Sequence, residues 1–268
     1  MGTSNSNSGQ KGNTPLVPSW VDDGPGDNPG DDKPLPPPGD RDRFRYPRKE
    51  FTDYIKSSGR NSGSLHRAAS NYVRHSLGGA SNASQRLGAA KSSSTRLISV
   101  LGSISANGLN ATLERHGFKN LIGKPIDQIF LGLVDYICPD GGRTDEGIAR
   151  NAFIDLLPLI KEMGIEENSG INETQLRAIM EVYFSNVIMQ RLINDIGKNT
   201  FRLPDDIDEI NFIESQLSEF IKGTVSDAIT GLGIDFQEIS DERAREVVDG
   251  VYLTAYTILE NLAEEGEE

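Results

Sequence analysis

Residues 173–196, ETQLRAIMEVYFSNVIMQRLINDI, decide the fold class of this 268-residue chain. Apolar residues recur in this stretch at steps of three and four, which is the spacing of one face of an α-helix. Gly197 follows directly, and glycine is common just past the end of a helix. The apolar face consists of Leu176, Met180, Tyr183, Phe184, Val187, Ile188 and Leu192. The stretch therefore predicts a long helix with one buried side.

Helical periodicity continues on both sides of this stretch. The periodicity predicts one helix that begins after Thr144, as its N-cap, and runs through Leu157. A kink is expected near Pro158, because proline disrupts the preceding helical turn. No alternation of apolar and polar residues is long enough to predict a strand. The remaining predicted helices cover residues 47–58, 65–77, the second half of 80–106, 109–116, 126–137, 205–229 and 241–264. The fold class that follows is all-α, with a helical bundle-like body.

The first 40 residues differ in composition from the rest of the chain. They are rich in Gly, Pro, Ser, Asn and Asp, and the spacing of Pro and Gly excludes both helix and strand. We expect a long disordered tail over residues 1–40. A basic helical or linker segment over residues 41–106 and an acidic all-α domain over residues 107–268 would follow it.

A short apolar motif lies inside this tail, behind the polar leader MGTSNSNSGQKGNT (residues 1–14). Two prolines bias the backbone of the motif towards extended polyproline II and remove two hydrogen-bond donors. An extended segment of this kind suits the groove of another protein. The residues predicted to contact such a partner are Thr3, Ser4, Pro15, Leu16, Val17, Pro18 and Trp20, the only tryptophan of the chain.

The formal net charge of −13 is distributed unevenly. Residues 1–40 carry a net charge of −4, residues 41–96 carry +9 and residues 97–268 carry −18. The basic segment interleaves cations with Phe44 and Tyr46, a pattern that suits stacking on, and phosphate contacts to, single-stranded nucleic acid. The alternative is that it neutralises the acidic body or an acidic partner, and the pI near 4.8 favours this alternative. The candidate contacts are Arg41, Arg43, Arg45, Arg48 and Lys49.

Few residue patterns in the chain are typical of catalysis or of metal binding. The single cysteine, Cys138, excludes an internal disulfide and a Cys-pair metal site. Its place before Pro139 favours a buried structural residue over a catalytic thiol, which would need a histidine partner and a lowered pKa. The pair Lys91-Ser92 lacks the glycines of a phosphate-binding loop. We therefore expect a protein that is not an enzyme and that uses no cofactor and no metal.

Acidic residues cluster around the turn that follows Cys138. They suit metal binding or acid–base chemistry, but acids in the first turn of a helix also stabilise it by capping and through the macrodipole. The capping interpretation is the favoured one. The residues concerned are Asp135, Asp140, Asp145 and Glu146.

The hydropathy of the chain indicates its location. No apolar run approaches the roughly 18 residues of a membrane-spanning helix, and the N-terminus lacks the apolar core of a signal peptide. A cytoplasmic protein with no membrane contact is the expectation.

Several stretches of the chain resemble one protein family. They are MGTSNSNSG (1–9), GNTPLVPSW (12–20), the basic middle rich in Ser, Gly and Ala, LVDYICPDGGRTDEGIARNAF (133–153) and RLINDIG (191–197). Together they resemble QatB, a component of the bacterial Qat anti-phage defence system, over nearly the whole chain. The leader and the ICPDGG–DEGIAR block are the most specific parts of the resemblance.

The resemblance implies three companion proteins: an ATPase (QatA-like), a QueC-like enzyme (QatC-like) and a TatD-like nuclease (QatD-like). QueC-like enzymes activate a carboxylated 7-deazaguanine with ATP and pass it to an amine, which in related defence systems is a protein N-terminus. The resemblance thus implies a non-catalytic protein with Gly2 as the acceptor, because removal of the first methionine exposes the α-amine of that glycine. The alternative is a scaffold or adaptor that binds the ATPase or nucleic acid without being modified.

Overall fold

The computed structural model describes residues 43–139, 141–165, 170–196, 204–234 and 239–262. Within these ranges every regular element is helical and no strand is present. The all-α prediction is confirmed for this part of the chain, whereas the predicted disordered tail lies outside the described residues. None of the described helices is both long enough and apolar enough to cross a membrane.

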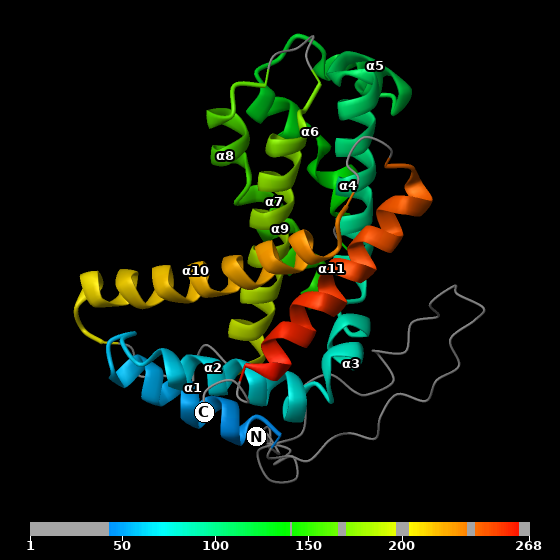
Figure 1. Cartoon of the computed structure of the whole chain (residues 1–268). Helices are drawn as coiled ribbons and strands as arrows, with labels where there is room; N and C mark the ends of the chain where they lie inside the picture. The colour runs from blue at the N-terminus through cyan, green and yellow to red at the C-terminus, as the bar shows by residue number, and fades with distance from the viewer. Residues whose placement is uncertain (1–42, 140, 166–169, 197–203, 235–238, 263–268) are drawn as a thin grey trace, which may run out of the picture. The chain divides into compact units, whose positions relative to one another are not determined.

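Helices follow one another through the described ranges with short connections (Figure 1). Two of the elements are single turns of other helix types, the π-helical turn η1 and the 3-10 turn η2. In chain order the elements are α1 (Arg45–Lys56), α2 (Ser62–Asn71), η1 (Tyr72–Ser76), α3 (Ala80–Gln85), α4 (Ala89–Asn107), α5 (Leu109–Arg115), η2 (Lys119–Leu121), α6 (Ile126–Ile137), α7 (Thr144–Ile154), α8 (Leu157–Glu162), α9 (Glu173–Ile196), α10 (Ile207–Gly231) and α11 (Asp241–Asn261).

The helix α9 forms the centre of this arrangement. It packs against α10, α7 and α4, and α10 runs across it (Figure 1). Every residue of the apolar face predicted for it is buried, and Ile179 and Ile196 are buried as well. Burial of each large apolar side chain contributes about 1.5–3 kcal/mol, so α9 provides a large share of the stabilising contacts in the body.

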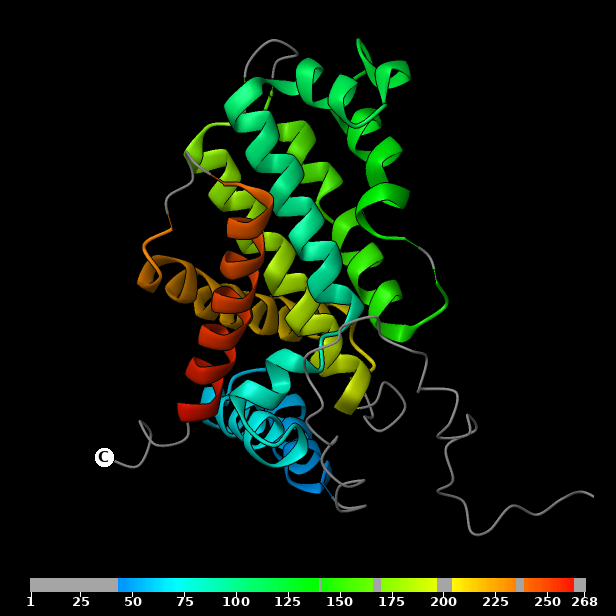
Figure 2. The same ribbon diagram turned by 90° about the vertical axis from the view of Figure 1, so that its right-hand side faces the viewer.

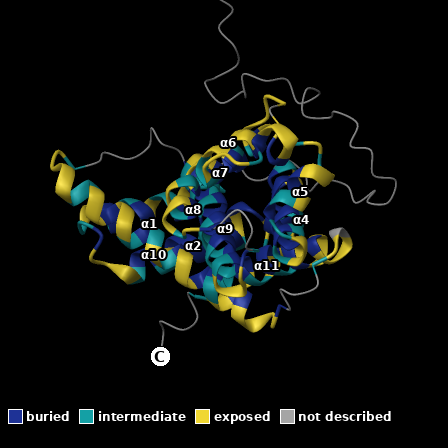
Figure 3. Cartoon of the chain, turned by 90° about the horizontal axis from the view of Figure 1, so that it is seen from above, coloured by how far each residue is buried: buried dark blue, intermediate teal, exposed yellow. Residues whose placement is uncertain are grey.

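The helix α11 closes the body against α4, α3, α10 and α2. The ring of Tyr252 meets the ring of Phe184 edge-on, with 4.8 Å between the centroids. The hydroxyl of Tyr252 forms a buried hydrogen bond of 2.8 Å with Ser94 Oγ on α4. Figure 2 shows α4 running beside α9, and Figure 3 shows buried residues where α4, α9 and α11 meet.

The two N-terminal helices, α1 and α2, pack against each other and against α10. Tyr54 OH donates a hydrogen bond of 3.2 Å to the carbonyl oxygen of Ile213, and burial raises the pKa of Tyr54 to about 12. Gly59, in the turn after α1, has a φ of +72°, and a Cβ there would lie 3.3 Å from Ile213 Cα. Glycine is therefore needed at this turn both for its backbone conformation and for the close approach of α10.

Two local predictions, at Thr144 and Pro158, are wrong. Arg143 precedes the first helical residue of α7, and its N–H donates to Glu146 Oε2 at 2.9 Å, so Thr144 is not the N-cap. In place of one kinked helix, α7 and α8 are separate, and Pro158 lies in the first turn of α8. Proline is tolerated there because the first N–H groups of a helix have no partner within the helix.

Helix boundaries also differ in the N-terminal third. The helix predicted over residues 65–77 begins earlier, at Ser62, and continues directly into η1. Asn61 caps its start, because Asn61 Oδ1 accepts a hydrogen bond of 3.1 Å from the N–H of Ser64. The first half of residues 80–106, for which the sequence predicts no helix, contains α3 and the start of α4. Small polar residues there give little periodic signal, and burial against α11 favours the helix.

The expected boundary between residues 106 and 107 falls inside the last turn of α4. Buried residues on both sides of it belong to one hydrophobic cluster, which includes Leu101 and Ile104 before the boundary and Leu109 and Leu113 after it. The division of the chain into a basic helical or linker segment over residues 41–106 and an acidic all-α domain over residues 107–268 stays a prediction.

Candidate functional site

The residues predicted for the modified and partner-binding N-terminus lie outside the described residues. The same holds for the first residue of the basic segment. The set is Gly2, Thr3, Ser4, Pro15, Leu16, Val17, Pro18, Trp20 and Arg41. Their roles stay predictions, and the described part of the candidate site begins at Arg43.

The start of the described chain is fixed to two helix ends. Ser76 Oγ, at the end of η1, donates a hydrogen bond of 2.6 Å to the carbonyl oxygen of Arg43. Arg48 Nε donates a hydrogen bond of 2.8 Å to the carbonyl oxygen of Ile196, which has no partner within α9 because it lies in the last turn. The guanidinium carbons of Arg43 and Arg48 lie 4.8 and 5.4 Å from the centroid of the Phe44 ring. We call these five residues the anchor.

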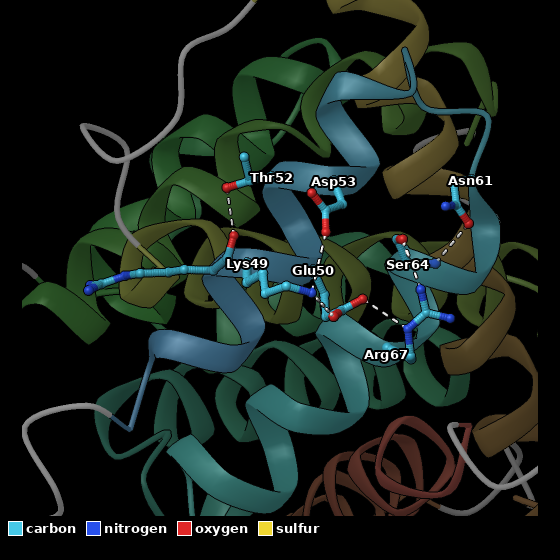
Figure 4. Close-up of polar contacts among 8 residues, drawn as sticks. Lys49, Glu50, Thr52, Asp53, Asn61, Ser64 and Arg67 are labelled. Atoms are coloured by element: carbon cyan, nitrogen blue, oxygen red, sulfur yellow. Dashed lines mark hydrogen bonds and ion pairs between the residues drawn. The ribbon is translucent and has the colours of Figure 1, made fainter.

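The next cation, Lys49, is paired within its own helix (Figure 4). Its Nζ lies 3.0 Å from Glu50 Oε1 and 3.6 Å from Asp53 Oδ2. Arg67 Nε of α2 donates to Glu50 Oε2 at 2.9 Å. Burial acts to raise the pKa of Glu50, but the hydrogen bonds from Arg67 and Lys49 outweigh it, so the pKa is lowered. Lys49 therefore neutralises acids of this chain.

Arg45 and Tyr46 are exposed members of the basic segment. Tyr46 is 62% exposed, and its ring centroid lies 6.4 Å from that of His75. Neither Arg43 nor Arg45 forms an ion pair with any residue in the described ranges. Within the described ranges, Lys49 is thus paired with acids, Arg48 binds a carbonyl oxygen of α9, and Arg43 and Arg45 form no ion pair.

Arg191, near the end of α9, organises a second polar cluster. Its Nε donates to Asp195 Oδ2 at 2.9 Å, and its Nη1 forms an ion pair with Asp145 in the first turn of α7. The same Nη1 lies 3.5 Å from the carbonyl oxygen of Arg86, in the turn between α3 and α4. Tyr72 OH of η1 donates to Asp195 Oδ2 at 2.8 Å. We call these five residues the arginine–aspartate junction, and it joins four segments that are distant in sequence.

Burial and neighbouring charges act in opposite directions on the pKa values of Asp145 and Arg191. Burial raises the pKa of Asp145, and Arg191 opposes this shift without overcoming it. Burial acts to lower the pKa of Arg191, but Asp195 and Asp145 outweigh it and raise that pKa. The pKa of Arg86 is lowered by burial and then by repulsion from Arg43 and Arg191. Arg43 of the anchor is therefore close enough to Arg86 for the two charges to repel each other.

The block at residues 133–153 holds Cys138 in a structural environment. Its side chain is fully buried, and its Sγ lies 3.6 Å from the carbonyl oxygen of Ala149. Burial raises the pKa of the thiol. Arg150 Nη1 donates to the carbonyl oxygen of Cys138 at 3.1 Å and pairs with Asp135 Oδ1 at 2.7 Å. A buried thiol with a raised pKa is a poor nucleophile.

The acids around this block have separate partners. Asp135 pairs with Arg150, Asp145 pairs with Arg191, and Glu146 accepts the N–H of Arg143. Asp140 lies outside the described residues. Within the described ranges no three His, Cys, Asp or Glu side chains are grouped so that they could hold a metal ion. Asp145 and Glu146 both lie in the first turn of α7, as the capping interpretation predicts, although Asp145 also pairs with Arg191, whereas Asp135 pairs with Arg150.

Sequence reasoning missed the junction. Arg191 and Asp195 are four residues apart on one predicted helix, and this spacing is a recognised signal for an ion pair. The contributions of Tyr72, Arg86 and Asp145 depend on how distant helices pack, so no local pattern indicates them. The junction nevertheless joins two of the stretches that carry the family resemblance, since Asp145 lies in 133–153 and Arg191 begins 191–197.

Comparison with known proteins agrees with this observation. Residues 78–259, about two thirds of the chain, match the model of a family described as the Qat anti-phage system associated protein QatB. No curated protein and no solved structure matched the chain. The matched range includes α7, α9 and the contact between them. The tail, the basic helix α1 and the anchor residues up to Ser76 all precede this range. This chain belongs to the QatB family of proteins associated with the Qat anti-phage system.

Proposed function

We propose that this protein is a non-catalytic component of a bacterial anti-phage defence complex and that it presents its N-terminus to a QueC-like partner enzyme. Gly2 would accept a deazaguanine-type group there. Family membership supports the role in defence. The observation that carries the presentation is the anchor, because Ser76 and Ile196 fix Arg43 and Arg48 to the body. Every residue predicted to meet the enzyme precedes that fixed point in the chain.

The chemistry requires only a free α-amine from this chain. The partner would use ATP to convert the carboxylate of the deazaguanine into an acyl adenylate, with release of pyrophosphate. The neutral amine of Gly2 would then attack the acyl carbon, so that a C–N bond forms, the C–O bond to AMP breaks and the amine loses a proton. An α-amine has a pKa of about 7.7–8.0, so a useful fraction is neutral at cellular pH. Glycine has no side chain to hinder the approach.

The helical body would provide the binding surface for the remaining components of the complex. A QatA-like ATPase and a QatD-like TatD-family nuclease are the further partners that we propose, together with the QatC-like enzyme, in the bacterial cytoplasm. The buried junction suits this role, because it holds η1, α7 and α9 in one arrangement beside the anchor. A rigid body would keep Arg43, where the N-terminal segment joins it, in a fixed position.

Intact-mass spectrometry of the full chain, co-expressed with the QueC-like partner, tests the proposal. We expect a mass increase on the N-terminal peptide that begins at Gly2. A partner inactivated in its ATP site is the matched control and should leave the mass unchanged. An unmodified N-terminus during phage challenge, in cells where the system protects, would overturn the proposal.

A second candidate function is an adaptor that is not modified. Arg43 and Arg45 form no ion pair with a described residue, and with the exposed ring of Tyr46 they favour a contact with an anionic partner, either an acidic protein surface or single-stranded nucleic acid. Deletion of residues 2–10 separates the two functions, because the adaptor keeps the motif around Trp20 and should still protect. Capture on single-stranded DNA must decrease with salt if the contact is to phosphates.

A further inference from the structure

A groove lies between the last turns of α9 and the first half of α10. It has a volume of about 450 Å³. Met189 and Ile193 of α9 and Leu217 of α10 provide its apolar lining, and Glu214 is an exposed acid beside them. The other lining residues are Asn211, Ser215 and Ser218. The groove is thus apolar at its centre and polar along the α10 side.

An unusually exposed apolar residue extends this lining. Ile207, the first residue of α10, is 70% exposed. It lies four residues before Asn211 and seven before Glu214, so helical geometry places the three on one face. A large aliphatic side chain left in water at the end of an apolar groove is a feature of binding surfaces when other apolar residues adjoin it.

The half of α10 that borders the groove is strongly acidic. Residues 205–219 contain six Asp and Glu and no Lys or Arg. None of these acids forms an ion pair with a residue in the described ranges, although Glu209 accepts a hydrogen bond from Ser58 and Asp206 caps the N–H of Asp208. Elsewhere in the body acids such as Glu50, Asp145 and Asp195 have arginine partners. The charge around the groove is therefore available to a cationic partner.

We propose that the groove between α9 and α10 is a docking site for a basic, apolar segment of a partner protein, with aliphatic side chains on the lining and Lys or Arg beside Glu214. Charge complementarity determines this choice of occupant. Acidic segments would be repelled by residues 205–219, which excludes the Asp-rich part of this chain at residues 22–32 as a good fit. The proposal does not depend on modification of Gly2.

Binding of a defined probe to the full chain tests the proposal. The probe is a fluorescent 14-residue helical peptide with a leucine face and a lysine face, and its control has glutamate in place of every lysine. We expect the lysine peptide to bind and the glutamate peptide not to bind. Glu214→Lys should weaken binding by at least about tenfold, because it places like charges together at the contact. Ile207→Ser should weaken it by about tenfold through lost apolar burial.

Two matched variants on another face of α10 make the test specific. Glu219→Lys makes the same charge change as Glu214→Lys, and Phe212→Ser removes an exposed apolar residue, 44% exposed, as Ile207→Ser does. We expect both controls to bind the peptide as the unchanged chain does. If Glu219→Lys weakened peptide binding as much as Glu214→Lys, the attraction would be diffuse, and the proposal would be overturned. Equal weakening by Phe212→Ser and Ile207→Ser would show adventitious apolar contact and would also overturn it. Self-association of the unchanged chain that Glu214→Lys abolishes would also overturn it, since the occupant would then be a second copy.

Discussion

Arg191 on α9 forms an ion pair with Asp145 on α7 across 46 residues of sequence. The same guanidinium pairs with Asp195, whose carboxylate also accepts a hydrogen bond from the hydroxyl of Tyr72. Both aspartates are mostly buried, with side chains 24% and 13% exposed. Two carboxylates of α7 and α9 therefore depend on one cation for their charge balance.

Replacement of Arg191 by Met should be strongly destabilising. The change removes the cation that forms ion pairs with both partly buried aspartates, so the cost should exceed the value of about 1 kcal/mol for an exposed pair and lie nearer the value of about 3–5 kcal/mol for a buried one. Urea unfolding measures it. Arg177→Met is the control, because Arg177 pairs with Glu181 at a more exposed site, 36% for the arginine, and should cost about 1 kcal/mol or less. Equal losses for the two variants would contradict the importance of the junction.

The tyrosines near the junction predict a second contrast. Both Tyr72 and Tyr256 are fully buried, but Tyr72 OH donates to Asp195 whereas Tyr256 OH has no hydrogen-bond partner in the described ranges. Tyr72→Phe should cost about 1.5–3 kcal/mol, the value of a hydrogen bond to a charged group. Tyr256→Phe should be neutral or slightly stabilising, because it removes an unpaired hydroxyl. The unfolding free energies of the two variants decide this, and a loss at Tyr256 as large as that at Tyr72 would refute it.

Sequence periodicity could predict the helices because helical burial is a local pattern. The seven apolar residues predicted for the buried face of α9 recur at helical spacing, and all seven are buried in the structure. The break between α7 and α8 could not be distinguished from a kink, since Pro158 is compatible with either. Asp145 illustrates the limit for the site: position in a first turn predicts capping, whereas its partner is an arginine that only tertiary packing brings near.

The groove could not be predicted from the sequence either, because it depends on how two helices pack. Met189 and Ile193 lie outside the apolar face predicted for α9, and only the packing of α9 against α10 brings them together with Leu217. The family resemblance predicted more than periodicity did, because it located the two segments that Asp145 and Arg191 join. It could not predict the contact itself.

Glycines in two helices predict opposite effects of alanine. A Cβ at Gly102 of α4 would lie 2.8 Å from Ile239 Cβ and 3.0 Å from its carbonyl oxygen, whereas a Cβ at Gly223 of α10 meets nothing within 4 Å. Gly102→Ala should cost about 1–3 kcal/mol through overpacking. Gly223→Ala should stabilise by about 0.4–1 kcal/mol, because alanine restricts the unfolded chain and favours helix. Thermal unfolding of both variants checks the pair, and stabilisation by Gly102→Ala would show that Ile239 is not packed on α4.

The network of Lys49, Glu50 and Arg67 predicts a pH dependence. The pKa of Glu50 is lower in the folded chain than its ordinary value. A carboxyl with a lowered folded pKa contributes stability above its unfolded pKa, near 4.3, and loses it as the pH falls through the folded pKa. Glu50→Gln should therefore be less stable than the unchanged chain by up to about 1 kcal/mol at pH 7, because Arg67 is half exposed. The difference should vanish in acid below the folded pKa, and a difference that persists unchanged there would contradict the assignment.

Cys138 provides the test of the remaining catalytic alternative. Its side chain is fully buried, its pKa is raised by burial, and its Sγ contacts the carbonyl oxygen of Ala149. A thiol-reactive disulfide reagent should label the native chain only as fast as the body opens, and labelling should become complete within the mixing time in concentrated urea. Cys138→Ser should keep phage protection in a chain that remains folded by circular dichroism. Rapid labelling of the native chain, together with loss of protection in folded Cys138→Ser, would instead support a nucleophilic role for the thiol.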